Sequence, residues 1–135
     1  MSYLLDTDTC IYLINGKSPL LLQRLKTHNP NDIKLSAITV SELFFGVFKS
    51  ERQEQNHQAL LKFLIPFEII PFGEPEAVEF GRIRAHLEKT GNRIGPYDMQ
   101  IAAIALAHQL VVVTNNTREF SRIPKLNIEN WTVTH

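Results

Sequence analysis

The stretch that decides the fold covers residues 96–114 and reads PYDMQIAAIALAHQLVVVT. Its first part, Pro96 to His108, is rich in Ala and Ile and predicts a largely buried helix that begins at the proline. Its second part, Leu110 to Thr114, is a run of apolar, mostly β-branched residues and predicts a buried strand. A buried helix that leads directly into a buried strand is typical of a parallel sheet covered by helices.

The rest of the chain alternates in the same way. We expect strands at residues 3–5, 33–36 and 67–70 and a final extended segment at 126–131. We expect helices at residues 9–13, 19–27, 39–49, 52–64, 74–90 and 117–121. The sequence therefore predicts an α/β fold with a short, mostly parallel central sheet, although no strand separates the two helices on either side of Gly91.

Length and charge limit the possible classes of protein. The chain has 135 residues, so we expect one domain over 1–135. Its 14 basic residues equal its 14 acidic residues, which argues against binding of nucleic acid through the whole surface. Cys10 is the one cysteine and lies in an apolar stretch, so we expect a buried thiol and no intrachain disulfide.

The apolar runs of the sequence predict where in the cell the protein lies, because signal peptides and membrane spans need long uninterrupted apolar segments. Asp6 and Asp8 break the first apolar run, so a signal peptide is not expected. No segment approaches the roughly 18 uninterrupted apolar residues that a membrane span requires. We therefore expect a cytoplasmic protein that does not cross a membrane.

Four carboxylates that are distant in sequence are predicted to meet at one edge of the sheet. Asp6 ends the first strand, Glu42 is expected in the first turn of the helix after the second strand, and Glu119 follows the strand ending at Thr114. The helix carrying Asp98 feeds that last strand, so its first turn also lies at the carboxyl edge. Ligands bind at this edge of a parallel α/β sheet.

Each acid also has a simpler interpretation, which the sequence leaves open. Asp6 or Asp8 could cap the first helix, and Asp98 in a first helical turn complements the helix dipole. The patterns Thr39-x-x-Glu42 and, more loosely, Asn116-x-x-Glu119 match a capping box. The functional interpretation depends on all of the acids meeting at one place.

A group of crowded carboxylates favours a hard divalent cation. Carboxylates in contact repel each other, and a cation removes that cost. Oxygen ligands select Mg²⁺ or Mn²⁺, which can activate water and stabilise a leaving oxygen in phosphodiester hydrolysis. The five histidines are too scattered to suggest zinc: His28, His57, His86, His108 and His135.

Four stretches together resemble the PIN-domain nucleases, and within them the VapC toxins of bacterial toxin–antitoxin pairs. These stretches are LLDTDT at 4–9, SELFFG at 41–46, GPYDMQIA at 95–102 and TNNTREF at 114–120. The resemblance implies an α/β/α sandwich and an acidic site that binds Mg²⁺ or Mn²⁺.

The resemblance also implies roles for individual residues. Asp6, Glu42 and Asp98 match the three principal acids of the family. Glu119 is assigned the fourth position, where Asn115 and Asn116 are the other candidates, and Asn116 is expected to orient the site. Three supporting residues are expected to lie behind the acids or to bond to them: Thr7, Asp8 and Thr114.

Partners and substrates are likewise implied by the resemblance. VapC-like toxins are held inactive by a VapB-type antitoxin, which also binds DNA, and they usually form homodimers. For Phe44, Phe45 and Phe48, contact with a partner and core packing remain open. Family substrates are structured RNAs, chiefly tRNA or a ribosomal RNA loop, and the anticodon loop of initiator tRNA is our hypothesis. Six basic residues are candidate RNA contacts: Arg82, Arg84, Arg93, Arg118, Arg122 and Lys125.

Two rival functions remain open. Asp6-Thr7-Asp8 has the D-x-D pattern of haloacid dehalogenase phosphatases, but Cys10 stands where that family needs Thr or Val. In the other alternative, the acids are helix caps and the domain is a scaffold without catalytic activity.

Overall fold

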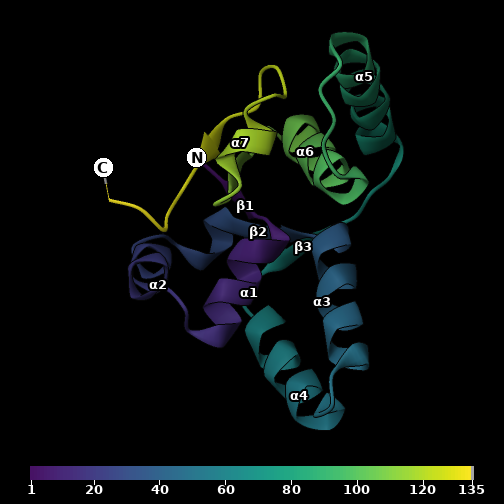
Figure 1. Cartoon of the computed structure of the whole chain (residues 1–135). Coiled ribbons are helices and arrows are strands. Elements are labelled where there is room, and N and C mark those ends of the chain that lie inside the picture. Colours follow the sequence, from purple (N-terminus) through teal and green to yellow (C-terminus); the bar gives the residue numbers. More distant parts are fainter. Residues whose placement is uncertain (135) are drawn as a thin grey trace.

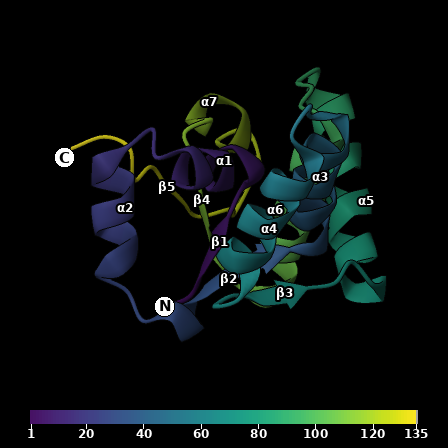
Figure 2. The same cartoon turned by 90° about the horizontal axis from the view of Figure 1, so that it is seen from below.

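The computed structural model of the chain describes residues 1–134, so His135 lies outside the described residues. Its centre is a five-stranded sheet in the order β3-β2-β1-β4-β5, and each of the four pairings is parallel. Figure 2 shows this order across the molecule. The strands are β1 (Tyr3–Leu5), β2 (Ile33–Ser36), β3 (Glu68–Ile70), β4 (Val111–Val113) and β5 (Ile128–Glu129). The predicted α/β class is confirmed.

Helices cover both faces of the sheet, which confirms the expected α/β/α sandwich (Figure 1). One face is packed by α5 (Glu74–Thr90), α6 (Pro96–His108) and α7 (Thr117–Phe120). The other is packed by α1 (Thr7–Asn15), α2 (Pro19–Lys26), α3 (Ala37–Lys49) and α4 (Gln53–Leu64). A 3-10 helix, Pro30–Asp32, precedes β2. None of the helices in residues 1–134 has the length and apolar character needed to cross a membrane.

The central strands serve both cores because successive side chains point to opposite faces. Leu4 and Val112 lie in the core with α5 and α6, whereas Leu5 and Val113 lie in the core with α1 and α3. All four are at most 1% exposed. Strands of only three residues can therefore hold two helical layers together.

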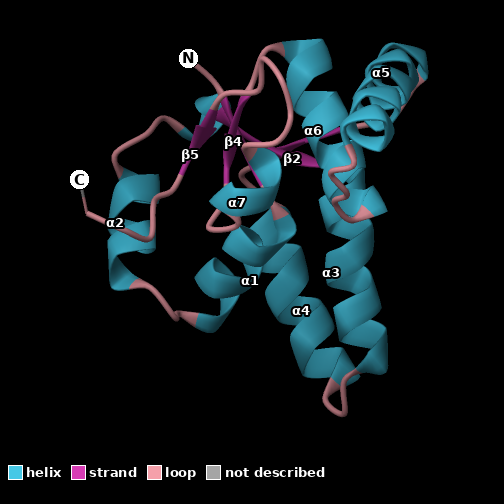
Figure 3. Ribbon diagram, turned by 45° about the horizontal axis from the view of Figure 1, so that its top comes forward, coloured by secondary structure: helices cyan, strands magenta, loops and turns pink. Residues whose placement is uncertain are grey.

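The two consecutive helices pack as a pair, and this explains the missing strand between them. Gly91 ends α5 in the left-handed conformation, with φ of 74°, and the chain then turns into α6. Residues 101–105 of α6 are fully buried. Figure 3 shows α5 beside α6 and the hairpin of α3 and α4 projecting beyond the sheet.

Two helices begin two residues earlier than the sequence predicted, because the residue directly before each helix caps it. Asp6 was a predicted cap of the first helix, which is confirmed, whereas Ser36 was not identified as a cap. The first begins at Thr7, since Asp6 Oδ1 accepts a hydrogen bond from Thr9 N at 2.9 Å. Helix α3 begins at Ala37, since Ser36 Oγ accepts from Thr39 N at 2.9 Å. The capping-box interpretation of Thr39-x-x-Glu42 is therefore wrong, and Glu42 lies in the second helical turn.

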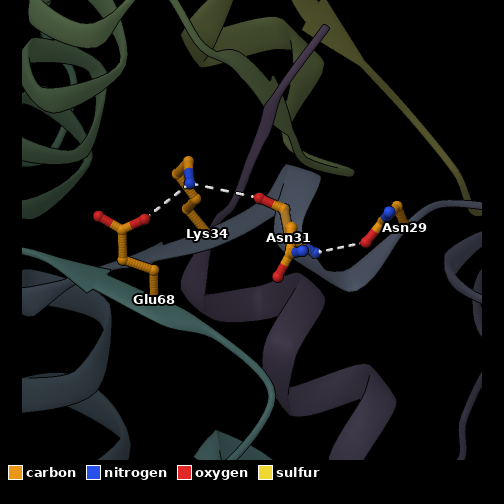
Figure 4. Close-up of polar contacts among 4 residues, drawn as sticks. All are labelled: Asn29, Asn31, Lys34 and Glu68. Atoms are coloured by element: carbon orange, nitrogen blue, oxygen red, sulfur yellow. Dashed lines mark hydrogen bonds and ion pairs between the residues drawn. The ribbon is translucent and has the colours of Figure 1, made fainter.

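A polar contact aligns β2 with β3 (Figure 4). Lys34 Nζ lies 2.8 Å from Glu68 Oε1 and donates to Asn31 O at 3.3 Å. Asn29 Oδ1 accepts from Asn31 N at 3.0 Å and caps the 3-10 helix. Because Glu68 is mostly exposed, the ion pair stabilises this register only weakly.

Candidate active site

Asp6 lies at the carboxyl end of β1, beside the end of β4. Leu5 pairs with Val113, and Asp6 N donates to Val113 O at 3.1 Å. Thr9 Oγ1 donates to the same carbonyl at 3.1 Å. The backbone of Asp6 is thereby held at the sheet edge, and the residue is only 3% exposed.

The surroundings of Asp6 have opposing effects on the ionised form of its carboxylate. Burial raises its pKa, hydrogen bonds from Thr114 and Thr9 lower it, and the charge of Asp8 raises it, with a net rise. Hydrogen-bond donors on a buried carboxylate favour the ionised form, whereas loss of water opposes it. A nearby cation would remove the remaining cost.

Glu42 reaches the same edge from the second turn of α3. Thr7 Oγ1 donates a hydrogen bond to Glu42 Oε1 at 2.6 Å and lies 3.1 Å from Thr39 Oγ1. Thr7 is the first residue of α1, directly after Asp6. The bond therefore connects the two helices that follow β1 and β2 and fixes the orientation of the Glu42 carboxylate.

Asp98 and Glu119 form the other half of the acidic site. Burial raises the pKa of Asp98 to about 7, and a hydrogen bond with Glu119 and the charges of Glu119, Asp6 and Glu42 add to this rise. Asp98 lies in the first turn of α6 and Glu119 in α7. The four acids are thus close enough to affect one another, as the sheet topology predicted.

The acids open into a surface depression between α1, α3 and α6. Asp6, Glu42 and Asp98 line it, together with Thr7 and the exposed Asp8. Lys49 is the one basic residue among its lining residues, and sequence analysis did not select it. Lys49 follows Glu42 by seven positions, which is two helical turns, so its place on the same face could have been predicted.

Asn116 orients Glu119 rather than capping α7. Within the structure of residues 1–134, its side chain makes no capping bond to α7, and Asn116 Nδ2 instead donates to Glu119 Oε2 at 2.5 Å. Thr114 Oγ1 accepts from Asn116 N at 2.8 Å. The loose capping-box interpretation of Asn116 and Glu119 is therefore wrong, and Thr114 supports both Asp6 and the Asn116 backbone.

The donor chemistry of the acids fits a hard divalent cation. All their ligand atoms are carboxylate oxygens. Burial and then the neighbouring carboxylates raise the pKa of Asp98, and a cation relieves both the cost of the buried charge and the repulsion. In residues 1–134, no three His, Cys, Asp or Glu side chains are already arranged to hold a metal ion. The carboxylates would have to close around the ion as it binds.

The described histidines lie in other surroundings. His28 stacks on Trp131, His57 lies beside Phe44, and His86 lines the groove beside α5 and α6. His108 Nε2 lies 2.8 Å from Glu76 Oε2.

The six basic candidates for RNA contact do not line the acidic depression. Arg82 and Lys125 line a groove beside α5 and α6, and Arg84 and Arg93 line another near Gly91. Arg122 Nη1 donates to the Arg93 carbonyl at 2.7 Å, and Arg118 is exposed on α7 beside Glu119. Of the six, Arg118 is nearest in sequence to an acid of the site.

A family model, curated relatives and solved structures all match this chain to the same family of proteins. The PIN domain family matches residues 3–126, which include all four acids. The tRNA(fMet)-specific endonuclease VapC of Salmonella typhimurium is 40% identical over 131 residues, 97% of this chain and 98% of that protein. Ribonuclease VapC2 of Rickettsia felis is 42% identical over 132 residues, again 97% and 98%. The crystal structure of VapBC2 from Rickettsia felis, bound to a promoter DNA fragment, superposes with a TM-score of 0.92 at 41% identity, covering 97% of this chain and 99% of that one.

Proposed function

This chain belongs to the PIN-domain family, among its VapC ribonucleases, and on that premise we propose that it is a toxin that hydrolyses a phosphodiester bond of RNA at its acidic site. The observation that carries this proposal is that Asp6, Glu42 and Asp98, which are distant in sequence, line one depression at the carboxyl edge of the sheet, with Glu119 hydrogen-bonded to Asp98. We include Mg²⁺ or Mn²⁺ in the proposal, because oxygen ligands in this arrangement suit these ions. We also propose that residues 1–135 form a single PIN domain.

Each acid has a proposed part in the reaction. Asp6, Asp98 and Glu119 would hold the cation, which would supply an activated water and stabilise the leaving oxygen. Glu42, oriented by Thr7, would hold the attacking water at the open side of the depression. Asn116 would keep the Glu119 carboxylate turned toward Asp98.

Two observations guide the choice of substrate. The Salmonella typhimurium relative is named for tRNA(fMet), so we propose initiator tRNA, cut in its anticodon loop. A loop presents unpaired bases that a protein surface can separate and bind. Action on tRNA would place the protein in the cytoplasm.

The partner is proposed from the structural relatives. VapBC complexes superpose on nearly the whole chain, so we propose a VapB-type antitoxin that holds this chain inactive. We also propose that the chain forms a homodimer. The phosphatase alternative is not favoured, because the matching relatives are ribonucleases.

The direct test is to incubate the antitoxin-free protein with total tRNA in Mn²⁺ or in EDTA, with Asp98→Asn as the control variant. One discrete cut, absent in EDTA and in the variant, is the expected result, and end-mapping then identifies the RNA. If tRNA and ribosomes both remain intact in Mn²⁺, the nuclease proposal is wrong and the scaffold alternative takes its place.

A further inference from the structure

Two large aromatic side chains stand exposed at the rim of the acidic site. Phe45 of α3 is 65% exposed and Tyr97 of α6 is 57% exposed. Both line a depression between these helices, whose wall includes Glu42. Glu42 and Phe45 also line the depression that holds Asp6 and Asp98, so the two depressions adjoin.

These rings are not required for the core. Phe44, the neighbour of Phe45, is partly buried and packs against the core formed with α1 and α3. Phe45 points away from that core, and its exposed area is costly in water. An exposed aromatic ring beside a reactive site is a surface available for stacking.

A positive charge accompanies the rings. Lys49 Nζ lies 5.2 Å from the centroid of the Phe45 ring, a cation–π distance, and Lys49 lines the acidic depression. The remaining charged residues in that lining are acidic, namely Asp6, Asp8, Glu42 and Asp98. A phosphate group that approaches the acidic depression can therefore make one favourable electrostatic contact there, with Lys49.

We propose that Phe45, Tyr97 and Lys49 form a nucleotide-binding subsite, in which the rings stack on unpaired bases and Lys49 contacts the backbone phosphate next to the cleaved bond. This inference rests on the proposed ribonuclease function. Bases in a duplex are already stacked, whereas bases in a loop are free to stack on aromatic rings. The subsite would thus select unpaired RNA at the position where cleavage occurs.

The test measures binding without cleavage. In EDTA, a fluorescent RNA hairpin with an unpaired loop is titrated with wild type, Phe45→Leu and Tyr97→Leu, and a fully paired RNA duplex is the second probe. Each variant should bind the hairpin about tenfold more weakly, as loss of one stacked base predicts, and the duplex as wild type does. Phe48→Leu is the matched control, because Phe48 is 60% exposed on the same helix but lines neither depression.

Lys49 is tested by the salt dependence of the same binding. Lys49→Gln should lower the slope of log affinity against log salt concentration by about 0.7, whereas Lys49→Arg and the exposed control Lys89→Gln should leave it unchanged. Unchanged melting temperatures show that the variants fold.

Three results would overturn the inference: hairpin binding equal to wild type in both aromatic variants, equal losses for hairpin and duplex, or a wild-type dimer that both variants convert to monomers. The last result would assign this face to a second copy of the chain. The outcome is separate from that of the proposed function, because hairpin binding in EDTA is measured whether or not the protein cleaves tRNA in Mn²⁺.

Discussion

The hydroxyl of Thr7 donates a 2.6 Å hydrogen bond to Glu42, a residue 35 positions further along the chain. The bond joins the first turn of α1 to the second turn of α3 at the carboxyl edge of the sheet. It orients a carboxylate that no helix cap explains, since Ser36 and not Thr39 caps α3.

Replacement of Thr7 by Val keeps the side-chain shape and removes this bond. We expect cleavage of tRNA to slow by about 10- to 100-fold, as is typical when a group that orients a reactive ligand is lost. Thr7→Ser retains a hydroxyl and should recover most of the rate. Single-turnover rates in Mn²⁺ give the comparison, and a Thr7→Val rate equal to wild type would show that Glu42 needs no orientation.

The raised pKa of Asp98 predicts how stability depends on pH. In the folded protein this pKa is about 7 against an ordinary value of 3.8, so the folded state holds the proton more tightly than the unfolded state. The contribution of Asp98 to the free energy of unfolding therefore falls as pH rises from about 4 to about 7. Asp98→Asn removes this contribution and should melt at a higher temperature than wild type at pH 8.

Divalent cations should act on the same group. Mn²⁺ that binds only the folded state raises the melting temperature, and the rise should be larger at pH 8 than at pH 5, where Asp98 is protonated. Thermal melts of wild type and Asp98→Asn at both pH values check both statements. Identical pH and Mn²⁺ responses in the two proteins would contradict the assignment of Asp98.

Glu76 provides a contrasting buried acid with a structural role. Its Oε1 accepts from Gly73 N at 2.7 Å at the start of α5, and its Oε2 lies 2.8 Å from His108 Nε2. Glu76→Ala should lower the free energy of unfolding by about 1–3 kcal/mol, because it removes the hydrogen bonds that this buried carboxylate makes to Gly73 N and to His108. Cleavage of tRNA at a temperature where the variant is folded should match wild type.

Exposed Glu74, on the same helix, serves as the control for Glu76. Glu74→Ala should change stability by less than about 0.5 kcal/mol. Loss of cleavage in folded Glu76→Ala would mean that this end of α5 influences the active site.

The parts of the fold that sequence predicted are those set by local signals. The bounds of α5 and α6 follow from Gly91 and Pro96, and their prediction is confirmed residue for residue. The common edge of the acids follows from parallel strands, which fix where each connecting helix begins. These features need only the order of apolar runs and turn residues.

The parts that sequence did not predict depend on contacts between distant segments. Ser36 and Thr39 are both good capping residues, and the sequence alone did not decide between them; α3 begins directly after β2, with Ser36 as its cap. The pairing of Asp98 with Glu119 joins α6 to α7 across the end of β4, which no local pattern encodes. The exposure of Phe45 beside buried Leu43 likewise follows from how α3 packs on α4.

The most direct test of the central claim is the single-turnover cleavage rate of Glu42→Gln on initiator tRNA in Mn²⁺. The substitution keeps the size of the side chain and removes only the charge of a residue that caps no helix. We predict an unchanged melting temperature and a rate reduced by more than the roughly 100-fold that loss of a supporting group causes. A rate equal to wild type, with the same cleavage site, would show that the acidic edge is not the catalytic site.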